Sequence, residues 1–352
     1  MNSGPFIVAL TSDFYDSSGA PRYADIGLSV LAEHPRIKTR VFEEHRKQIG
    51  ADQIGDAQGV MVLTPAVTVD SVSNADNLLV MARFGVGYDA VDVKACTAAD
   101  VLVTITAGAV DRPVAEAVIG WMIALSHHMR RKDALVRGGQ WDERSKYMGR
   151  ELRDRTLGVI GLGGIARKVI ELLRGFGMKI PLAYDPFVSE ASAADHGARL
   201  VSLEQLLRQS DFVSIHCPLT AATRGLLGSR ELALMKPDAY LLNTARGGIV
   251  DEDALYAWLE NRRIAGAALD CFVEEPVNAP SRFRDLDNVL LAPHSIAWTD
   301  ELFRDMGRAA CQVMVDLSHG VKPSGVLNSE LLDRPSFKEK WARHVKGSPI
   351  PG

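Results

Sequence analysis

The sequence has few cysteines and no long apolar run, and each absence excludes a class of protein. The four cysteines are far apart, with no C-x-x-C pair and no histidine-rich spacing typical of a metal site. They predict buried, reduced thiols and no bound metal. No apolar run reaches the roughly 18 residues needed to span a bilayer, and the N-terminal residues lack a basic stretch followed by an apolar one. We therefore expect a cytoplasmic protein with no membrane partner.

The sequence also has no large excess of positive or negative charge. Lys and Arg together number 40, and Asp and Glu number 44, so the formal net charge is -4. This balance provides no basic face for a polyanion, and we expect no nucleic-acid partner. Apolar residues make up 47% of the 352 residues, which is enough for two domain cores.

Apolar strand patterns alternate with helical patterns along nearly the whole chain. This alternation is typical of parallel α/β sheets covered by helices on both faces. A long helix is expected from Arg112 to about Arg137, and a last helix from about Thr299 to His319. The sequence thus predicts two doubly wound domains, a discontinuous one formed by 1–111 plus 300–352 and a second one formed by 112–299. The expected strands are Phe6–Leu10, Thr39–Phe42, Gly59–Leu63, Leu78–Ala82 and Val101–Val103 in the first domain, and Leu157–Ile160, Ile180–Tyr184, Phe212–His216, Tyr240–Asn243, Gly266–Leu269 and Val289–Leu291 in the second.

The most specific local pattern lies between Leu157 and Asp185. It reads as an apolar strand, a glycine turn, a helix, a second strand and an acid, which is the signature of a dinucleotide-binding unit. Gly161 permits the tight turn, Gly163 lets the backbone approach a pyrophosphate, and Ala166 allows close packing of helix on strand.

The acid at the end of this pattern indicates which cofactor binds. The Asp185 carboxylate can accept hydrogen bonds from an adenosine ribose. It would repel the 2′-phosphate of NADP by roughly 1–4 kcal/mol at a separation of about 4 Å. We therefore expect NAD as the cofactor. The alternative is that Asp185 only caps a turn before Pro186.

Parallel strands bring their carboxyl ends to one edge of a sheet, where ligands bind. Three residues that follow expected strands have chemistry suited to a 2-hydroxy acid or a 2-keto acid. Arg246 offers a permanently charged planar fork that matches a carboxylate with an adjacent oxygen. His294 titrates in the range needed to exchange the hydroxyl proton, and Glu275 on its other ring nitrogen would favour the imidazolium.

Each of these residues also has a simpler interpretation. Arg246 and Glu275 can be solvated loop residues, and His294 can cap a turn or pack against a linker. Cys217 and Cys271 follow strands near the same edge, but no base accompanies them in the sequence, so we interpret both as structural.

With these motifs, the chain resembles the D-isomer-specific 2-hydroxyacid dehydrogenase family over nearly all of residues 6–330. The resemblance implies a flavodoxin-like substrate domain and a Rossmann NAD-binding domain with the active site in a cleft between them. It also implies a homodimer formed through the cofactor domain. The stretches that carry it are Phe84–Asp92, Val114–Glu116, Gly161–Ala166, His216–Thr220, Asn243–Gly247, Asp270–Pro276 and Pro293–His294.

The resemblance also implies site residues. Arg246, Glu275 and His294 would be catalytic in the roles argued above. The turn around Val86 and Gly87 would present backbone N–H groups to the substrate carboxylate, and Asp270 would bond the nicotinamide carboxamide. The implied cofactor contacts are Gly161, Gly163, Gly164, Ile165, Asp185, His216, Pro218, Thr244, Ala245 and Asp270.

Two stretches depart from the family pattern and bear on the substrate. The loop 63–67 lacks the arginine found there in phosphoglycerate relatives, although Arg83 is near enough to pair with an anion. After His294 the family often has a glycine-rich turn, whereas this chain has Trp298. We hypothesise that Trp298 lines the substrate pocket, and the alternative is that it packs at the domain hinge.

The sequence therefore predicts an NAD-dependent oxidoreductase acting on CH–OH groups, which interconverts a D-2-hydroxy acid and its 2-keto acid. One alternative is D-3-phosphoglycerate dehydrogenase specifically. The other is a non-enzymatic protein that senses NAD(H) on the same scaffold.

Overall fold

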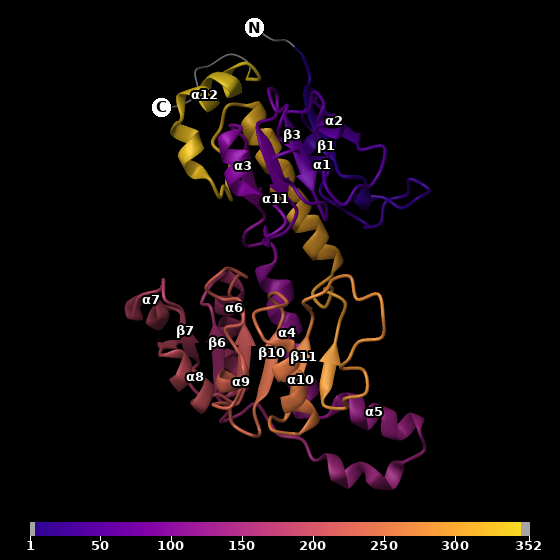
Figure 1. Cartoon of the computed structure of the whole chain (residues 1–352), viewed down its shortest axis with the longest axis vertical. Helices are drawn as coiled ribbons and strands as arrows, with labels where there is room; N and C mark the ends of the chain where they lie inside the picture. Colours follow the sequence, from indigo (N-terminus) through magenta and orange to yellow (C-terminus); the bar gives the residue numbers. More distant parts are fainter. Residues whose placement is uncertain (1–3, 346–352) are drawn as a thin grey trace. The chain divides into compact units, whose positions relative to one another are not determined.

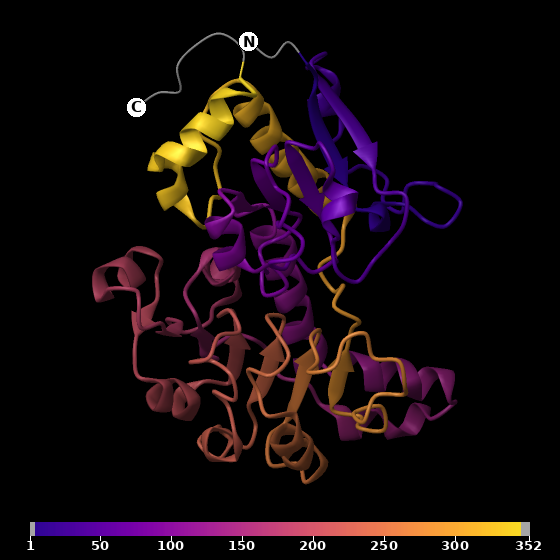
Figure 2. The ribbon, with the colours of Figure 1, turned by 45° about the horizontal axis from the view of Figure 1, so that its top comes forward.

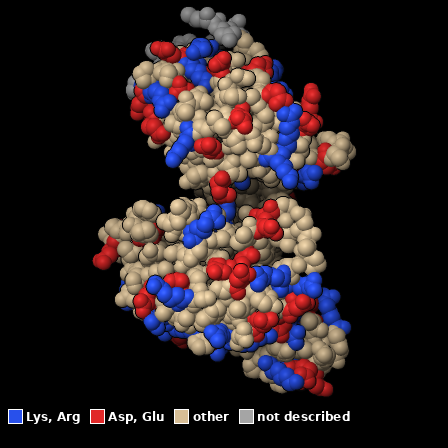
Figure 3. Space-filling view, viewed as in Figure 1, with Lys and Arg blue, Asp and Glu red and all other residues tan. Residues whose placement is uncertain are grey.

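The structure is a computed structural model that describes residues 4–345. These residues form two compact units, 4–110 together with 298–345, and 111–297. The second unit thus begins at residue 111 and ends at residue 297, whereas the sequence predicted that it would begin at 112 and end at 299. Acidic and basic side chains are interspersed on the face of each unit that Figure 3 shows. Among the described residues, no helix combines the length and the apolar character needed to cross a membrane.

The first unit contains a five-stranded parallel sheet in the order β2-β1-β3-β4-β5. This is the doubly wound order of flavodoxin-like folds, as predicted. The strands are short and apolar, and all four residues of β3 are buried because helices cover the sheet on both faces (Figure 1). The strand bounds are β1 (Phe6–Leu10), β2 (Ile37–Val41), β3 (Gly59–Val62), β4 (Val80–Arg83) and β5 (Leu102–Ile105).

Helix α11 (Asp300–Ser318) comes from the second chain segment of this unit and runs along the sheet (Figures 1 and 2). Thr299 caps it by accepting a hydrogen bond from the N–H of Leu302, as the residue type favours. Gly307 allows close packing, since an added Cβ would lie 1.9 Å from the carbonyl oxygen of Ile26. The other helices of the unit are η1 (Ser12–Phe14), α1 (Ser29–Ala32), α2 (Ala51–Ile54), α3 (Val93–Ala98), η4 (Ser329–Asp333) and α12 (Pro335–Ala342).

The second unit contains a seven-stranded parallel sheet in the order β12-β11-β10-β9-β6-β7-β8. The chain reverses direction across the sheet between β6 and β9, which makes this the switch point of a Rossmann fold. All the strands predicted for this unit are present, and β8 is an additional short edge strand. The bounds are β6 (Leu157–Ile160), β7 (Leu182–Tyr184), β8 (Arg199–Leu200), β9 (Phe212–Ile215), β10 (Tyr240–Asn243), β11 (Gly266–Leu269) and β12 (Val289–Leu291).

One predicted element of the second unit is wrong. The helix expected from Arg112 to about Arg137 is two helices, α4 (Asp111–Ser126) and α5 (Met129–Arg137). His128 between them has a φ of 51°, in the left-handed region, which ends the first helix. The remaining helices are η2 (Trp141–Tyr147), α6 (Gly164–Leu172), η3 (Leu173–Phe176), α7 (Glu190–Asp195), α8 (Leu203–Gln209), α9 (Ser229–Leu232) and α10 (Glu252–Glu260).

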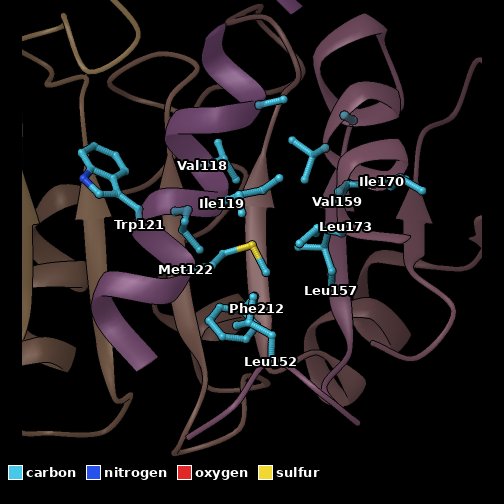
Figure 4. Packing of buried hydrophobic residues seen from close by; sticks show 14 of the residues in the cluster. Val118, Ile119, Trp121, Met122, Leu152, Leu157, Val159, Ile170, Leu173 and Phe212 are labelled. Atoms are coloured by element: carbon cyan, nitrogen blue, oxygen red, sulfur yellow. The ribbon is translucent and has the colours of Figure 1, made fainter. Parts of the chain in front are cut away.

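The two faces of this sheet carry two separate cores because successive side chains of a strand point to opposite faces. On β10, Leu242 packs in the core that includes α4 and α6, whereas Leu241 packs in the core that includes α10. Figure 4 shows the first of these cores, with Met122 of α4 near Phe212 of β9. The strands are thus buried against a core on each face, which fixes the positions of the strand ends.

Candidate active site

The glycine turn between β6 and α6 is built as the sequence predicts. Gly161 has a φ of 92°, and an added Cβ would lie 2.8 Å from the backbone nitrogen of Cys217. Gly163 is the N-cap of α6, and an added Cβ there would meet no atom within 4 Å. There is thus open space beside the N-cap of the nine-residue helix, whereas a Cβ on the next residue, Gly164, would lie 2.2 Å from the Asp111 carboxylate. The N–H groups of a helix N-terminus suit an anionic group.

Asp185 follows β7 and holds two backbone groups. Its Oδ2 accepts the N–H of Leu162 at 2.9 Å, and its Oδ1 accepts the N–H of Phe187 at 2.9 Å. The second bond is the turn cap considered in the sequence analysis. Each carboxylate oxygen has a further lone pair, so both are able to accept a ribose hydroxyl as well.

Two half-buried side chains that follow β9 and β10 have buried polar atoms without a hydrogen-bond partner among the described residues. These atoms are the two ring nitrogens of His216 and the hydroxyl oxygen of Thr244. Burial lowers the pKa of His216 to about 4, so its imidazole is neutral at pH 7. Buried polar atoms are nearly always hydrogen-bonded in folded proteins. These two side chains follow β9, which is the neighbour of β6, and β10, the next strand in the sheet, and they therefore fit a bound dinucleotide.

Asp270 organises the turn that follows β12. Its carbonyl oxygen accepts the N–H of His294 at 2.8 Å, and its Oδ1 accepts the N–H groups of Ser295 and Ile296 at 2.9 and 3.2 Å. Burial raises the pKa of this carboxyl, and the two N–H groups partly oppose the rise. Asp270 thus holds His294 in place through the backbone.

His294 and Glu275 form a direct pair. The distance from Nδ1 of His294 to Oε2 of Glu275 is 2.7 Å, and Oε1 of Glu275 accepts the N–H of Phe272 at 2.8 Å. Burial alone would raise the pKa of Glu275. The bonds from His294 and Phe272, with the charges of His294 and Arg246, outweigh burial and lower it. The carboxylate is therefore ionised at neutral pH.

Arg246 lies on the loop after β10. The side chain of Asn243 holds this loop, because its Nδ2 donates to the carbonyl of Arg246 and its Oδ1 accepts the N–H of Ala245. The loop packs closely against the backbone of Phe272, because a Cβ added to Gly247 would lie 2.0 Å from the carbonyl oxygen of Phe272. The second unit thus brings Arg246, Glu275 and His294 into one region.

Cys271 also lies in this region, near the sheet edge where the sequence analysis placed it, but its proximity to Glu275 and His294 was not predicted. Its Sγ lies 3.4 Å from the carbonyl oxygen of Ala245. One ligand atom each of Cys271, Glu275 and His294 lies within 4.8 Å of the others. In the sequence, only the position of Cys271 two residues after β11 indicated this proximity.

The predicted substrate contacts Val86 and Gly87 lie in the first unit, in a turn after β4. Gly85 has a φ of 133°. Its N–H donates to the hydroxyl of Thr106, and its carbonyl oxygen accepts the N–H of Thr106. Nε of Arg83 donates to the carbonyl of Gly87 at 2.8 Å, and its Nη1 donates to the carbonyl of Phe84. The Arg83 guanidinium therefore holds this turn.

Trp298 also lies in the first unit, with 55% of its surface exposed. Its ring packs edge-on against Phe303 of α11, with centroids 5.2 Å apart, and against Tyr23 at 5.9 Å. Tyr23 in turn stacks on Phe303 at 3.9 Å. The sequence analysis did not single out Tyr23.

Comparison with known proteins identifies the family of this chain. Residues 119–295 match the family model described as D-isomer specific 2-hydroxyacid dehydrogenase, NAD binding domain. A D-3-phosphoglycerate dehydrogenase of Methanocaldococcus jannaschii is 37% identical over 279 residues, 79% of this chain and 53% of that protein. A glyoxylate reductase of Korarchaeum cryptofilum is 34% identical over 311 residues, 87% of this chain and 93% of that protein.

The chain belongs to the D-isomer specific 2-hydroxyacid dehydrogenase family. Among solved structures, the crystal structure of a glyoxylate reductase from Paecilomyes thermophila has a TM-score of 0.79 and 26% identity, covering 94% of this chain and 100% of that one. The chain spans about half the length of phosphoglycerate dehydrogenases to which it is similar.

Membership of this family confirms NAD as the cofactor of the domain formed by residues 119–295, all of which lie in the second unit. All the predicted catalytic and cofactor residues fall within this range. The predicted substrate contacts Val86, Gly87 and Trp298 fall outside it, in the first unit.

Proposed function

We propose that this chain is an NAD-dependent D-2-hydroxyacid dehydrogenase that interconverts a 2-hydroxy acid and a 2-keto acid. The observation that carries the proposal is the 2.7 Å pair of His294 and Glu275 at the carboxyl edge of an NAD-binding sheet. A dehydrogenase of this kind must move one proton for each hydride, and the pair supplies a group able to do so.

In this proposal each catalytic side chain has one task. The guanidinium of Arg246 binds the substrate carboxylate and the adjacent keto oxygen, which fixes the orientation of the keto carbon. His294 gives a proton to that oxygen from Nε2, because Nδ1 is held by Glu275. The ionised Glu275 stabilises the imidazolium before transfer and fixes the ring orientation after it.

The residues present fit NAD. Gly163, Gly164 and Ile165 at the start of α6 would hold the pyrophosphate, and Asp185 would hold the adenosine ribose. His216 and Pro218 would cover the adenosine side. Thr244, Ala245 and Asp270 would lie toward the nicotinamide, which supplies the hydride when NADH is bound. The charge of Asp185 favours NAD over NADP.

The first unit contains further predicted contacts to the substrate. Backbone N–H groups around Val86 and Gly87 would bind the carboxylate, and Trp298 with Tyr23 would bound the space for the substituent at C3. Arg83 donates to backbone carbonyls of its own turn, so the structure offers little support for a phosphate clamp at that residue. We therefore favour a 2-keto acid without a phosphate.

D-3-Phosphoglycerate is the second candidate substrate. The observation that favours it is the 37% identity to a D-3-phosphoglycerate dehydrogenase. A purely sensory role is less well supported, because NAD(H) binding alone does not call for the His294–Glu275 pair.

We further propose a homodimer formed through the cofactor unit. Helix α4 is largely buried in its own core, but the segment that follows it exposes large apolar side chains. These are Met129, Val136, Trp141 and Met148, between 49% and 77% exposed. Exposed apolar surface of this extent on one segment is typical of an interface. Trp141→Glu should produce monomers in light scattering.

A cytoplasmic location remains a prediction from the sequence.

The first test measures NADH oxidation against glyoxylate, hydroxypyruvate, phosphohydroxypyruvate, pyruvate and bulkier 2-keto acids, with NADPH in parallel. We expect selective turnover with NADH. His294→Ala should lower kcat/KM by about 10²- to 10⁴-fold while NADH still binds. Turnover that survives this substitution would contradict the assigned proton donor, and binding of NADH without turnover of any acid would favour the sensor.

A further inference from the structure

We propose that Cys271, Glu275 and His294 form an inhibitory site for a divalent cation with affinity for sulfur, represented by Zn²⁺. One ligand atom from each side chain lies within 4.8 Å of the other two. Thiolate, imidazole and carboxylate are the protein ligands that Zn²⁺ binds. The binding claim stands on these three residues alone, whereas the inhibition rests on the proposed dehydrogenase function.

The spacing of the ligand atoms is close to what a tetrahedral ion needs. With metal–ligand distances of about 2.0–2.3 Å, ligand atoms around Zn²⁺ lie about 3.3–3.8 Å apart. Nδ1 of His294 and Oε2 of Glu275 are closer than this, at 2.7 Å, and no pair of the three ligand atoms is more than 4.8 Å apart. Movements of the side chains by about 1 Å would therefore suffice to bring the three atoms to tetrahedral spacing.

The charge of the surroundings also favours a cation. The Cys271 thiolate and the Glu275 carboxylate together balance the two charges of the ion. Two further acids lie close by, because Glu252 accepts the N–H of Val273 and the Asp270 carboxylate accepts N–H groups next to His294. Arg246 opposes them with a single charge.

Supporting contacts and an entry path are present. Oε1 of Glu275 accepts the N–H of Phe272, which orients the carboxylate while Oε2 turns to the ion. Cys271 is only 2% exposed, but His294 and Glu275 have side chains that are 44% and 34% exposed. An ion can thus arrive from solvent at the histidine and carboxylate and then bind the thiol. The thiol loses its proton to the buffer, and the fourth position remains for water.

Binding of the ion would stop proton transfer, because His294 and Glu275 cannot serve as a proton-transfer pair and as ligands at once. Inhibition would be reversed by a chelator. Serine in place of Cys271 removes the sulfur ligand without altering the histidine or the carboxylate.

The test is Co²⁺ titration of the untagged full chain, followed by absorption spectroscopy. We expect a sulfur-to-cobalt charge-transfer band in the wild type that is lost in Cys271→Ser and kept in Cys217→Ser, whose thiol is half-buried elsewhere in the unit. Lack of the band in the wild type, or its survival in Cys271→Ser, would overturn the site. Cys271→Ala, verified as folded by circular dichroism, replaces the serine variant if that variant does not fold.

Inhibition is measured separately with buffered Zn²⁺. Half-inhibition should need at least a tenfold higher free Zn²⁺ concentration in Cys271→Ser than in the wild type. Equal sensitivity of the two proteins would show that the ion inhibits elsewhere and would overturn the inhibitory role. If the protein reduces none of the 2-keto acids, the proposed function fails, but the cobalt spectrum still decides whether the site exists.

Discussion

Oδ2 of Asp185 accepts the backbone N–H of Leu162 at 2.9 Å, so the acid that follows β7 also holds the glycine turn that follows β6. The Asp185 carboxylate therefore has a structural role in the glycine turn, besides its proposed role in selecting NAD over NADP. The two roles can be separated by a substitution that keeps the acceptor oxygen and removes the charge.

Asp185→Asn is that substitution. Its amide oxygen can still accept the Leu162 N–H, but the repulsion of a 2′-phosphate, about 1–4 kcal/mol, is removed. We expect the ratio of kcat/KM with NADPH to kcat/KM with NADH to rise at least about fivefold. Thermal unfolding should change little. An unchanged ratio in a folded variant would show that Asp185 does not select the cofactor.

The glycine turn offers a matched pair of substitutions. Gly161→Ala forces a side chain into a φ of 92° and against the Cys217 backbone, so the free energy of unfolding should fall by about 2 kcal/mol or more. In Gly163→Ala the added Cβ lies in open space, so the free energy of unfolding should fall by less than about 1 kcal/mol. The same substitution should nevertheless weaken NADH binding at least about tenfold. Urea unfolding and NADH fluorescence measure the two effects. Unchanged binding by Gly163→Ala would place the pyrophosphate elsewhere.

The buried imidazole of His216 predicts a loss of stability in acid. Its pKa is about 4 when folded, below the ordinary 6.5, so between these values the unfolded chain binds a proton that the folded chain does not. Stability should fall as the pH decreases from 6.5 to 4, by at most about 1.4 kcal/mol per pH unit from this group. His216→Gln should remove this part of the slope in urea unfolding.

The exposed His45 provides a control for that experiment. His45→Gln should keep the wild-type dependence of stability on pH. A His216→Gln protein that loses stability as steeply as the wild type would show that the imidazole is not shielded from solvent protons.

The aromatic contacts of Trp298 predict a change in substrate preference. Trp298→Ala should raise kcat/KM for bulky 2-keto acids relative to glyoxylate, because it removes a large side chain that packs against Tyr23 and Phe303. Tyr23→Ala should shift preference in the same direction, whereas Tyr23→Phe preserves the stacked ring and should not. Unchanged relative values across the panel in Trp298→Ala would assign this residue to packing alone.

Much of the fold could be predicted because each buried parallel strand is a short apolar run between polar segments. Strands β6 and β10 begin and end where the sequence predicts. β8, however, has only two residues, Arg199–Leu200, and too short a pattern to detect. The break at His128 was missed because neither glycine nor proline marks it, and the left-handed φ of this residue depends on its surroundings.

The candidate site could be predicted only in part for a similar reason. Strand ends placed Arg246, Glu275 and His294 at one edge, and the expected bond of Glu275 to a ring nitrogen of His294 is present. The position of Cys271 beside that pair, however, depends on how the loops after β11 and β12 fold. Tyr23 was missed because nothing near it in sequence relates it to Trp298.

Helix α11 packs on β4 and β5. Its Met314 also lies against β3, because a Cβ added to Gly59 would be only 2.3 Å from the Met314 sulfur. The ribosome makes these strands first and this helix only after the whole second unit. A nascent chain therefore leaves one apolar face of its first sheet without this helix while the NAD-binding unit is translated. The second unit, which is one continuous segment, is able to fold earlier. The first unit can complete its core only after the second unit has been made.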